Sequence, residues 1–178
     1  MLTRLTRITT EIRSTNPYWE YHFDRYRMPA GKEGEYHYVH STGSTVVVPR
    51  LPDGTFILVR QFRYLLQRES LEFPCGGIKH GLGAEENARQ ELLEETGYKA
   101  DTMRLVGTFA PCNGITDELC SVYYTDTLTL EKSAPDDSEE FEILYVTKHQ
   151  INHYIQQGEL WDGMTLAAWT LYLSNDIS

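Results

Sequence analysis

The chain is poor in cysteine, and its few cysteines form no recognisable pattern. Only three occur among 178 residues, at Cys75, Cys112 and Cys120. The odd number argues against a disulfide framework, and the absence of a Cys-x-x-Cys spacing argues against a zinc site. We therefore expect reduced thiols and a cytoplasmic protein.

Basic residues and long apolar runs are also scarce. Lysine and arginine number 16 against 26 aspartates and glutamates, for a formal net charge of −10. This balance argues against a broad binding surface for nucleic acid or anionic membrane, because such surfaces depend on clustered basic side chains. No stretch approaches the roughly 20 apolar residues of a membrane span, and the N-terminus lacks the apolar segment of a signal peptide. A small anionic substrate would need a bound cation and a few placed arginines.

Repeats and low-complexity linkers are absent, and 178 residues suit one compact domain. Near the N-terminus, apolar and polar side chains alternate over residues 18–39 around a turn at 29–31. This alternation predicts an antiparallel β ribbon. The β-branched runs 44–49 and 55–60, joined by a turn with Asp53-Gly54, predict a hairpin.

Helical spacing begins at residue 84. Ala84, Ala88 and Leu92 form an apolar stripe at i, i+4 and i+8, which predicts a helix over 84–96 that ends at Gly97. Further elements are expected as strands at 102–110, 119–129 and 141–147, a helix from a capping box at Thr147 and Gln150 to Gly158, and a last helix over 164–173.

Three acids on the predicted helix suggest a cation site. Glu91, Glu94 and Glu95 stand at i, i+3 and i+4, so a helix places their carboxylates on one face. Arg89 is the only basic residue of this helix, and it faces away from them. Carboxylates without a basic neighbour one turn away favour a hard divalent cation such as Mg²⁺, which also bridges to phosphate. The alternative is a glutamate-rich face exposed to solvent.

Residues 76–98, GGIKHGLGAEENARQELLEETGY, resemble the Nudix box, with two departures. Leu82 stands where the family has a glutamate, and Gln90 where it has an arginine. The loss of this pair would remove a supporting salt bridge rather than a metal ligand. The resemblance implies an α/β (α+β) fold, with a mixed β-sheet sandwiched between helices and an N-terminal antiparallel β ribbon. Residues 1–42 would form the ribbon, for dimerisation and nucleotide stacking, and residues 43–178 the hydrolase domain.

Three segments outside the box resemble the ADP-ribose pyrophosphatases and related nucleoside diphosphate sugar hydrolases. They are Val59-Arg-Gln-Phe-Arg63, Glu72-Phe-Pro-Cys75 and the loop Pro111–Glu118. The resemblance implies a Mg²⁺-dependent pyrophosphohydrolase, with Mn²⁺ as a substitute. It would cleave the diphosphate of ADP-ribose or a related sugar nucleotide to a nucleoside monophosphate and a sugar phosphate.

The resemblance also implies roles for single residues. The expected metal ligands are the main-chain carbonyl of Cys75 and the carboxylates of Glu91, Glu95 and Glu94. The expected catalytic residues are Glu139, on an acidic loop at 136–142, and Glu94. Asp137 and Glu140 are alternatives to Glu139, and a solvated loop without a catalytic role is a third interpretation.

Substrate contacts are expected from residues of both parts of the chain. Arg63 suits bidentate contact with phosphate, and a nucleobase needs an aromatic platform. The expected substrate-binding residues are Arg63, Glu72, Trp19, Tyr36 and Glu118. The aromatic residues could instead serve core or interface packing, and the family resemblance implies a homodimer.

Two other functions are compatible with the sequence. One is a Nudix hydrolase of nucleoside triphosphates or other linked nucleotides. The other, suggested by Leu82 and Gln90, is a catalytically weak module that binds ADP-ribose or a sugar nucleotide as a sensor. His149 and His153 share a helical face, but no third ligand is evident and a surface helix is the simpler interpretation.

Overall fold

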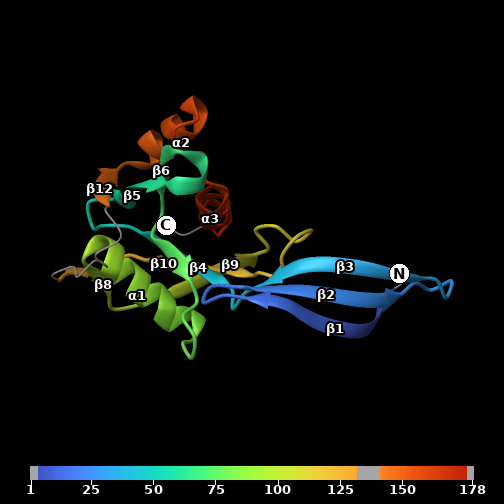
Figure 1. Cartoon of the computed structure of the whole chain (residues 1–178). Helices are drawn as coiled ribbons and strands as arrows, with labels where there is room; N and C mark the ends of the chain where they lie inside the picture. The colour runs from blue at the N-terminus through green and yellow to red at the C-terminus, as the bar shows by residue number, and fades with distance from the viewer. Residues whose placement is uncertain (1–3, 132–140, 176–178) are drawn as a thin grey trace. The chain divides into compact units, whose positions relative to one another are not determined.

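The computed structural model describes residues 4–131 and 141–175. The chain divides into two compact units (Figure 1). The first comprises Met1–Thr42 together with Ala110–Leu119, and the second comprises Gly43–Phe109 with Cys120–Ser178.

The first unit is a three-stranded antiparallel sheet in the order β1-β2-β3. Its strands are β1 (Thr6–Thr15), β2 (Glu20–Arg27) and β3 (Glu33–His40). The predicted ribbon corresponds to β2 and β3. Sequence analysis missed β1, because all ten of its residues are exposed and carry little apolar alternation.

Residues 110–119 are held against β3 within the first unit. The main-chain amide of Val39 donates to the carbonyl of Ile115 at 2.9 Å, and the Tyr36 hydroxyl donates to the carbonyl of Gly114 at 3.1 Å. Nδ1 of His40 and Oδ2 of Asp117 add a hydrogen bond at 2.7 Å. A segment distant in sequence thereby belongs to the first unit.

The described residues of the second unit form three sheets. A mixed sheet has the order β7 (Cys75–Gly77), β4 (Ser44–Pro49), β10 (Cys120–Thr125), β9 (Arg104–Phe109), with β4 and β10 parallel. An antiparallel sheet has the order β12 (Glu142–Val146), β5 (Phe56–Arg63), β6 (Arg68–Glu72). A small sheet pairs β11 (Leu128–Leu130) with β8 (Tyr98–Ala100), and a 3₁₀ turn, η1 (Tyr64–Leu66), joins β5 to β6.

The predicted hairpin of 44–49 with 55–60 is wrong, although both strands and the turn are present. β4 and β5 belong to different sheets. In the turn, Gly54 has a φ of +90°, and the carboxylate of Asp53 accepts from the amide of Thr55 at 2.9 Å. β4 is buried along its whole length and lies between β7 and β10, so both of its edges are already paired.

The three predicted helices are confirmed as α1 (Ala84–Thr96), α2 (Lys148–Gln157) and α3 (Gly163–Ser174). α1 ends at Gly97 with a φ of +74°, and α2 has the predicted capping box at Thr147 and a left-handed Gly158. Within the described residues, no helix combines the length and apolar character needed to cross a membrane.

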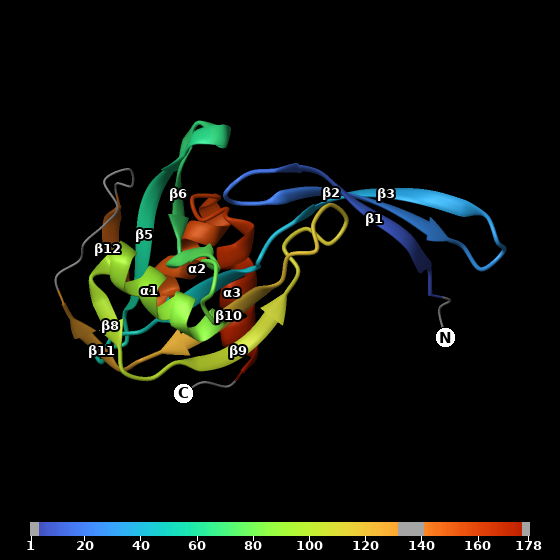
Figure 2. The ribbon, with the colours of Figure 1, turned by 60° about the horizontal axis from the view of Figure 1, so that its bottom comes forward.

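The mixed sheet is packed on both faces by helices of the same unit (Figure 2). Val47 of β4 lies in one apolar cluster with Ala88 and Leu92 of α1. Its neighbours Val46 and Val48 point the other way, because side chains alternate along a strand, and lie in the larger cluster. The expected sheet sandwiched between helices is therefore confirmed, and α1 is fixed against the sheet.

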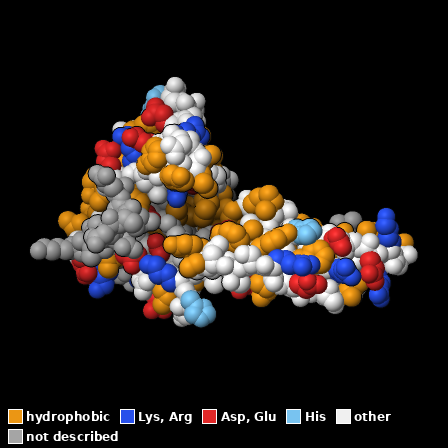
Figure 3. Space-filling model, viewed as in Figure 1, with side chains coloured by type: hydrophobic (Ala, Val, Ile, Leu, Met, Phe, Trp, Pro, Cys, Tyr) orange, Lys and Arg blue, Asp and Glu red, His pale blue; other side chains and the backbone are white. Residues whose placement is uncertain are grey.

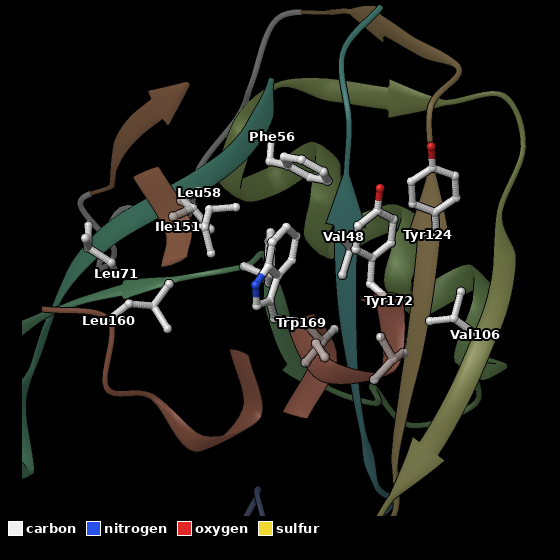
Figure 4. Packing of buried hydrophobic residues seen from close by; sticks show 14 of the residues in the cluster. Val48, Phe56, Leu58, Leu71, Val106, Tyr124, Ile151, Leu160, Trp169 and Tyr172 are labelled. Atoms are coloured by element: carbon white, nitrogen blue, oxygen red, sulfur yellow. The ribbon is translucent and has the colours of Figure 1, made fainter. Parts of the chain in front are cut away.

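The larger cluster is rich in aromatic rings (Figure 4). Trp169 and Tyr172 of α3 stack at 5.3 Å between ring centroids, and Tyr124 of β10 stacks on Tyr172 at 5.4 Å. Phe56 meets the edge of Trp169 at 5.1 Å. The polar atom of the tryptophan is satisfied as well, since its Nε1 donates to Asn152 at 2.9 Å. This core packs α3 against β4, β5 and β10.

Candidate functional site

The candidate site begins where β7 passes the acidic side of α1. Two of the predicted ligands, Glu91 and Glu95, are buried, with 8% and 6% of their surface exposed, and Glu94 is half-buried. Gly76 makes the close approach of β7 feasible, because a Cβ atom added there would lie 2.5 Å from Cδ of Glu91. The glycine of this turn therefore sets the distance between the strand and the carboxylates.

A lysine that sequence analysis missed lies among these carboxylates. The Lys79 ammonium is 2.6 Å from Oε2 of Glu94 and 3.4 Å from Oε1 of Glu91. Burial lowers the pKa of Lys79, but the hydrogen bond to Glu94 and the two nearby charges outweigh it, so the net shift is upward. Arg89 instead pairs with Glu85 at 2.9 Å, as its position on another face predicts.

A buried asparagine fixes the loop that carries Lys79. Asn87, fully buried on α1, accepts from the main-chain amide of Lys79 at 2.9 Å and donates to Oγ1 of Thr45 at 3.0 Å. The loop, the helix and β4 are thus joined through one side chain. Asn87 shares a helical face with Glu91, which lies one turn further on. Its position as a polar residue next to the apolar stripe was the sequence signal that could have identified it.

Two predicted substrate-binding residues, Arg63 and Glu72, form an ion pair with each other. Nε of Arg63 donates to Oε1 of Glu72 at 2.7 Å, and a second, shorter bond joins the guanidinium to Oε2. Gln61 also donates to Glu72 at 3.3 Å. The bond to Glu72 raises the pKa of Arg63 above its ordinary value, with burial opposing. Glu72 is fully buried, whereas 41% of the Arg63 side chain is exposed, so the guanidinium can also meet a ligand.

The thiol of Cys75 lies close to the acids. Its Sγ is 3.7 Å from Oε2 of Glu72. Burial raises the pKa of this thiol well above its usual value, and the charges of Glu95 and Glu72 add to the effect. The thiol is therefore neutral at neutral pH, and the main-chain carbonyl is the chemically suitable donor for a hard cation at this residue.

The chemistry of the donor set fits a divalent cation, because the carboxylates of Glu91, Glu94 and Glu95 and the main-chain carbonyl of Cys75 are the oxygen ligands that Mg²⁺ prefers. In residues 4–131 and 141–175, however, no three side chains of His, Cys, Asp or Glu are gathered closely enough to hold a metal ion. Glu94 is paired with Lys79, so in this arrangement the three carboxylates do not converge on one point. The predicted catalytic Glu139 and its alternatives Asp137 and Glu140 lie outside the described residues.

The other predicted substrate-binding residues belong to the first unit. Tyr36 and Glu118 both line a pocket of about 390 Å³ in this unit, together with Arg7, Asp24, Tyr38, Ala110, Asn113, Thr116, Asp117 and Leu119. Trp19, which is 43% exposed, is not among the lining residues. Tyr36 and Glu118, both predicted to bind substrate, therefore line one pocket although they are far apart in sequence.

Charged side chains of both signs lie close together on the first unit (Figure 3). Arg7 of β1 pairs with the carboxylate of Asp24 on β2 at 3.1 Å, at the rim of the pocket. The pocket therefore offers an aromatic ring together with charged and polar groups, which suits a nucleobase with donors and acceptors on its edge.

The chain is similar to proteins of a known family. The NUDIX domain matches residues 40–164. The ADP-ribose pyrophosphatase of Bacillus subtilis strain 168 is 32% identical over 143 residues, which cover 79% of this chain and 77% of that protein. The methanol dehydrogenase activator of Bacillus methanolicus is 26% identical over 147 residues, or 82% and 80% of the two chains.

Two further comparisons point the same way. The GDP-mannose pyrophosphatase of Pectobacterium atrosepticum is 28% identical over 137 residues, covering 72% of this chain and 71% of that protein. The crystal structure of an ADP compounds hydrolase superimposes with a TM-score of 0.84 at 18% identity, covering 98% and 95% of the two chains, and confirms the fold. Because the domain match spans most of its length and the helix carries the acidic motif, the chain belongs to the Nudix family of hydrolases.

Proposed function

We propose that the chain is a Mg²⁺-dependent pyrophosphohydrolase of ADP-ribose or a related nucleoside diphosphate sugar, with Mn²⁺ able to substitute. The observation that carries the proposal is the pair of buried carboxylates on α1, Glu91 and Glu95, of which Glu91 lies against Gly76. The similarity to ADP-ribose and GDP-mannose pyrophosphatases supports the substrate class. ADP-ribose would give AMP and ribose 5-phosphate.

The cation would be held by Glu91, Glu95 and the carbonyl of Cys75, with Glu94 assisting. When bound, it would offset the charge that develops on the diphosphate oxygens and lower the pKa of bound water. Glu139 is assigned the role of accepting a proton from the attacking water. As water adds to one phosphorus, the bond from that phosphorus to its bridging oxygen breaks.

Arg63 and Glu72 are assigned to substrate positioning. The guanidinium is held in one orientation by its two bonds to Glu72, which leaves its exposed part available to a phosphate oxygen. A preorganised arginine loses little side-chain entropy when it binds a phosphate. Base recognition is assigned to the first unit, where Tyr36 is preferred over Trp19 because it lines the pocket with Glu118.

A substrate panel tests the proposal. ADP-ribose, GDP-mannose, linked dinucleotides and nucleoside triphosphates are incubated with the protein and Mg²⁺ or Mn²⁺, and the released phosphate esters are identified. We expect a diphosphate sugar to be the best substrate and Glu95→Gln to lower kcat by at least about a hundredfold. Preferred cleavage of triphosphates would instead favour a Nudix hydrolase of nucleoside triphosphates. Binding of sugar nucleotides at micromolar concentration without any turnover would favour a module that senses these ligands without hydrolysing them.

A further inference from the structure

Three glutamates of α1, Glu91, Glu94 and Glu95, form an acidic cluster. Lys79 occupies a position in this cluster that a metal ion would otherwise approach. Its ammonium bridges Glu94, at 2.6 Å, and Glu91, at 3.4 Å, which lie one turn apart on α1. Glu91 is a proposed metal ligand, so the ammonium and a divalent cation compete for at least one carboxylate.

The main chain around Lys79 is fixed independently of this ion pair. Its amide donates to Asn87 at 2.9 Å, its carbonyl accepts from the amide of Leu82 at 3.0 Å, and the preceding amide, of Ile78, donates to Gly43 at 2.9 Å. The side chain, by contrast, is 45% exposed. The ammonium can therefore leave the cluster for solvent while the loop keeps its place.

We propose that Lys79 is a built-in counter-ion of the acidic cluster, which a divalent cation displaces from Glu91 and Glu94 when it binds. The inference rests on the proposed function, because it takes the cluster to be the metal site. In the absence of metal, Lys79 offsets the repulsion between carboxylates on one rigid helical face. When the cation enters, the like charges of ammonium and metal drive the side chain out. Lys79 thereby lowers the affinity for metal and sets the concentration at which the site fills.

Binding of Mn²⁺ to the full-length protein, without substrate, tests this role. Free Mn²⁺ is followed by electron paramagnetic resonance during titration of the wild type, Lys79→Met and Lys79→Glu. We expect Lys79→Met to bind Mn²⁺ about two- to fivefold more tightly, the factor that corresponds to loss of a half-exposed ion pair. Lys79→Glu adds a carboxylate, so we expect it to bind Mn²⁺ more tightly than Lys79→Met does. The gain of Lys79→Met should shrink in roughly 1 M salt, because salt screens exposed charges.

Lys99→Met is the matched control. Lys99 lies on β8 of the same unit and pairs with Glu131 at 3.4 Å instead of with a member of the acidic cluster. Its replacement by methionine makes the same change in net charge. We expect its Mn²⁺ affinity to equal that of the wild type. An equal gain in Lys99→Met would overturn the proposal, because the effect would then be one of overall charge.

The remaining outcomes separate this inference from the proposed function. If the wild type binds Mn²⁺ and Lys79→Met binds it equally or more weakly, Lys79 is not a competitor and only the inference fails. If neither protein binds Mn²⁺, both fail. Circular dichroism of each variant checks folding, and Lys79→Gln replaces Lys79→Met if the apolar side chain perturbs the loop.

Discussion

The carboxylate of Glu72 is fully buried and depends on one neighbour for its charge balance. Arg63 supplies that balance through two hydrogen bonds, and Gln61 adds a third. Removing one partner of a buried ion pair leaves a charge without compensation. The pair therefore has a structural role in addition to its proposed contact with substrate.

Replacement of Arg63 tests this structural role. For a fully buried pair the cost is about 3–5 kcal/mol. Because 41% of the Arg63 side chain is exposed, we expect Arg63→Met to lower the free energy of unfolding by about 2–3 kcal/mol. Denaturant titration measures the change. Arg60→Met is the control, since its pair with Glu142 at 2.9 Å is exposed and should contribute less than about 1 kcal/mol. Equal losses in both variants would contradict a special role for Glu72.

Gly76 has a second function beside its place in the turn, because it makes room for the carboxylate of Glu91. In Gly76→Ala the new Cβ would displace Glu91, so we expect at least a tenfold loss of Mn²⁺ affinity and about 1–3 kcal/mol of destabilisation from overpacking. Gly83→Ala is the control, since a Cβ there meets no atom within 4 Å. Titration with Mn²⁺ and thermal unfolding measure the two effects, and unchanged metal affinity in Gly76→Ala would count against Glu91 as a ligand.

Helix α2 owes its start to the capping box at Thr147. The Thr147 hydroxyl accepts from the amide of Gln150 at 3.2 Å, and the Gln150 side chain accepts from the amide of Thr147 at 2.8 Å. The next turn places Ile151, fully buried, in the main core. The cap therefore fixes where a core side chain enters.

Loss of this cap has a defined cost. Thr147→Ala leaves the amide of Gln150 without its side-chain acceptor, and we expect about 1 kcal/mol less stability, measured by denaturant unfolding. Thr170→Ala serves as the control, because its hydroxyl only donates to the Leu166 carbonyl within α3 and the residue is exposed. A loss in Thr170→Ala as large as that in Thr147→Ala would argue against capping as the cause.

Strand β1 leaves one edge of its sheet unpaired within the part of the chain that the structure describes, since β1 pairs only with β2. Ile8 and Ile12 on this strand are 39% and 56% exposed. An exposed strand edge with apolar side chains is a site for pairing with another chain. These features support the proposed homodimer.

Sedimentation equilibrium tests the dimer and the surface that forms it. We expect a dimer for the wild type and a dissociation constant at least tenfold higher for the double variant Ile8→Lys, Ile12→Lys, because lysine on an edge strand opposes pairing. The control Leu105→Lys replaces a residue of β9 in the second unit whose exposure, 55%, matches that of Ile12 at 56%. A monomeric wild type would contradict the homodimer. A double variant that dimerises like the wild type would show that the interface does not involve Ile8 and Ile12.

Local patterns in the sequence were sufficient for the helices and their ends. The apolar stripe of α1, the left-handed Gly97 and the capping box of α2 depend on residues within one or two turns of each other, so their spacing predicts their structure. The resemblance to the Nudix box added the fold and the identity of the acidic cluster. The domain match at residues 40–164 and the structural superposition confirm both the family and the fold.

Partners distant in sequence were decided only by the tertiary structure. Alternation along β4 indicates which side chains share a face. It does not indicate that the strand pairs with β10 instead of β5, because the spacing of residues within one strand does not specify its hydrogen-bonded partner strand. Helix α1 has no basic side chain within a turn of the acidic cluster, but the inference that its carboxylates lack a basic partner is wrong, because Lys79 pairs with Glu91 and Glu94. Lys79 reaches the cluster from a loop whose position depends on the buried Asn87 and Thr45, so only the packing of helix, loop and sheet could place that charge.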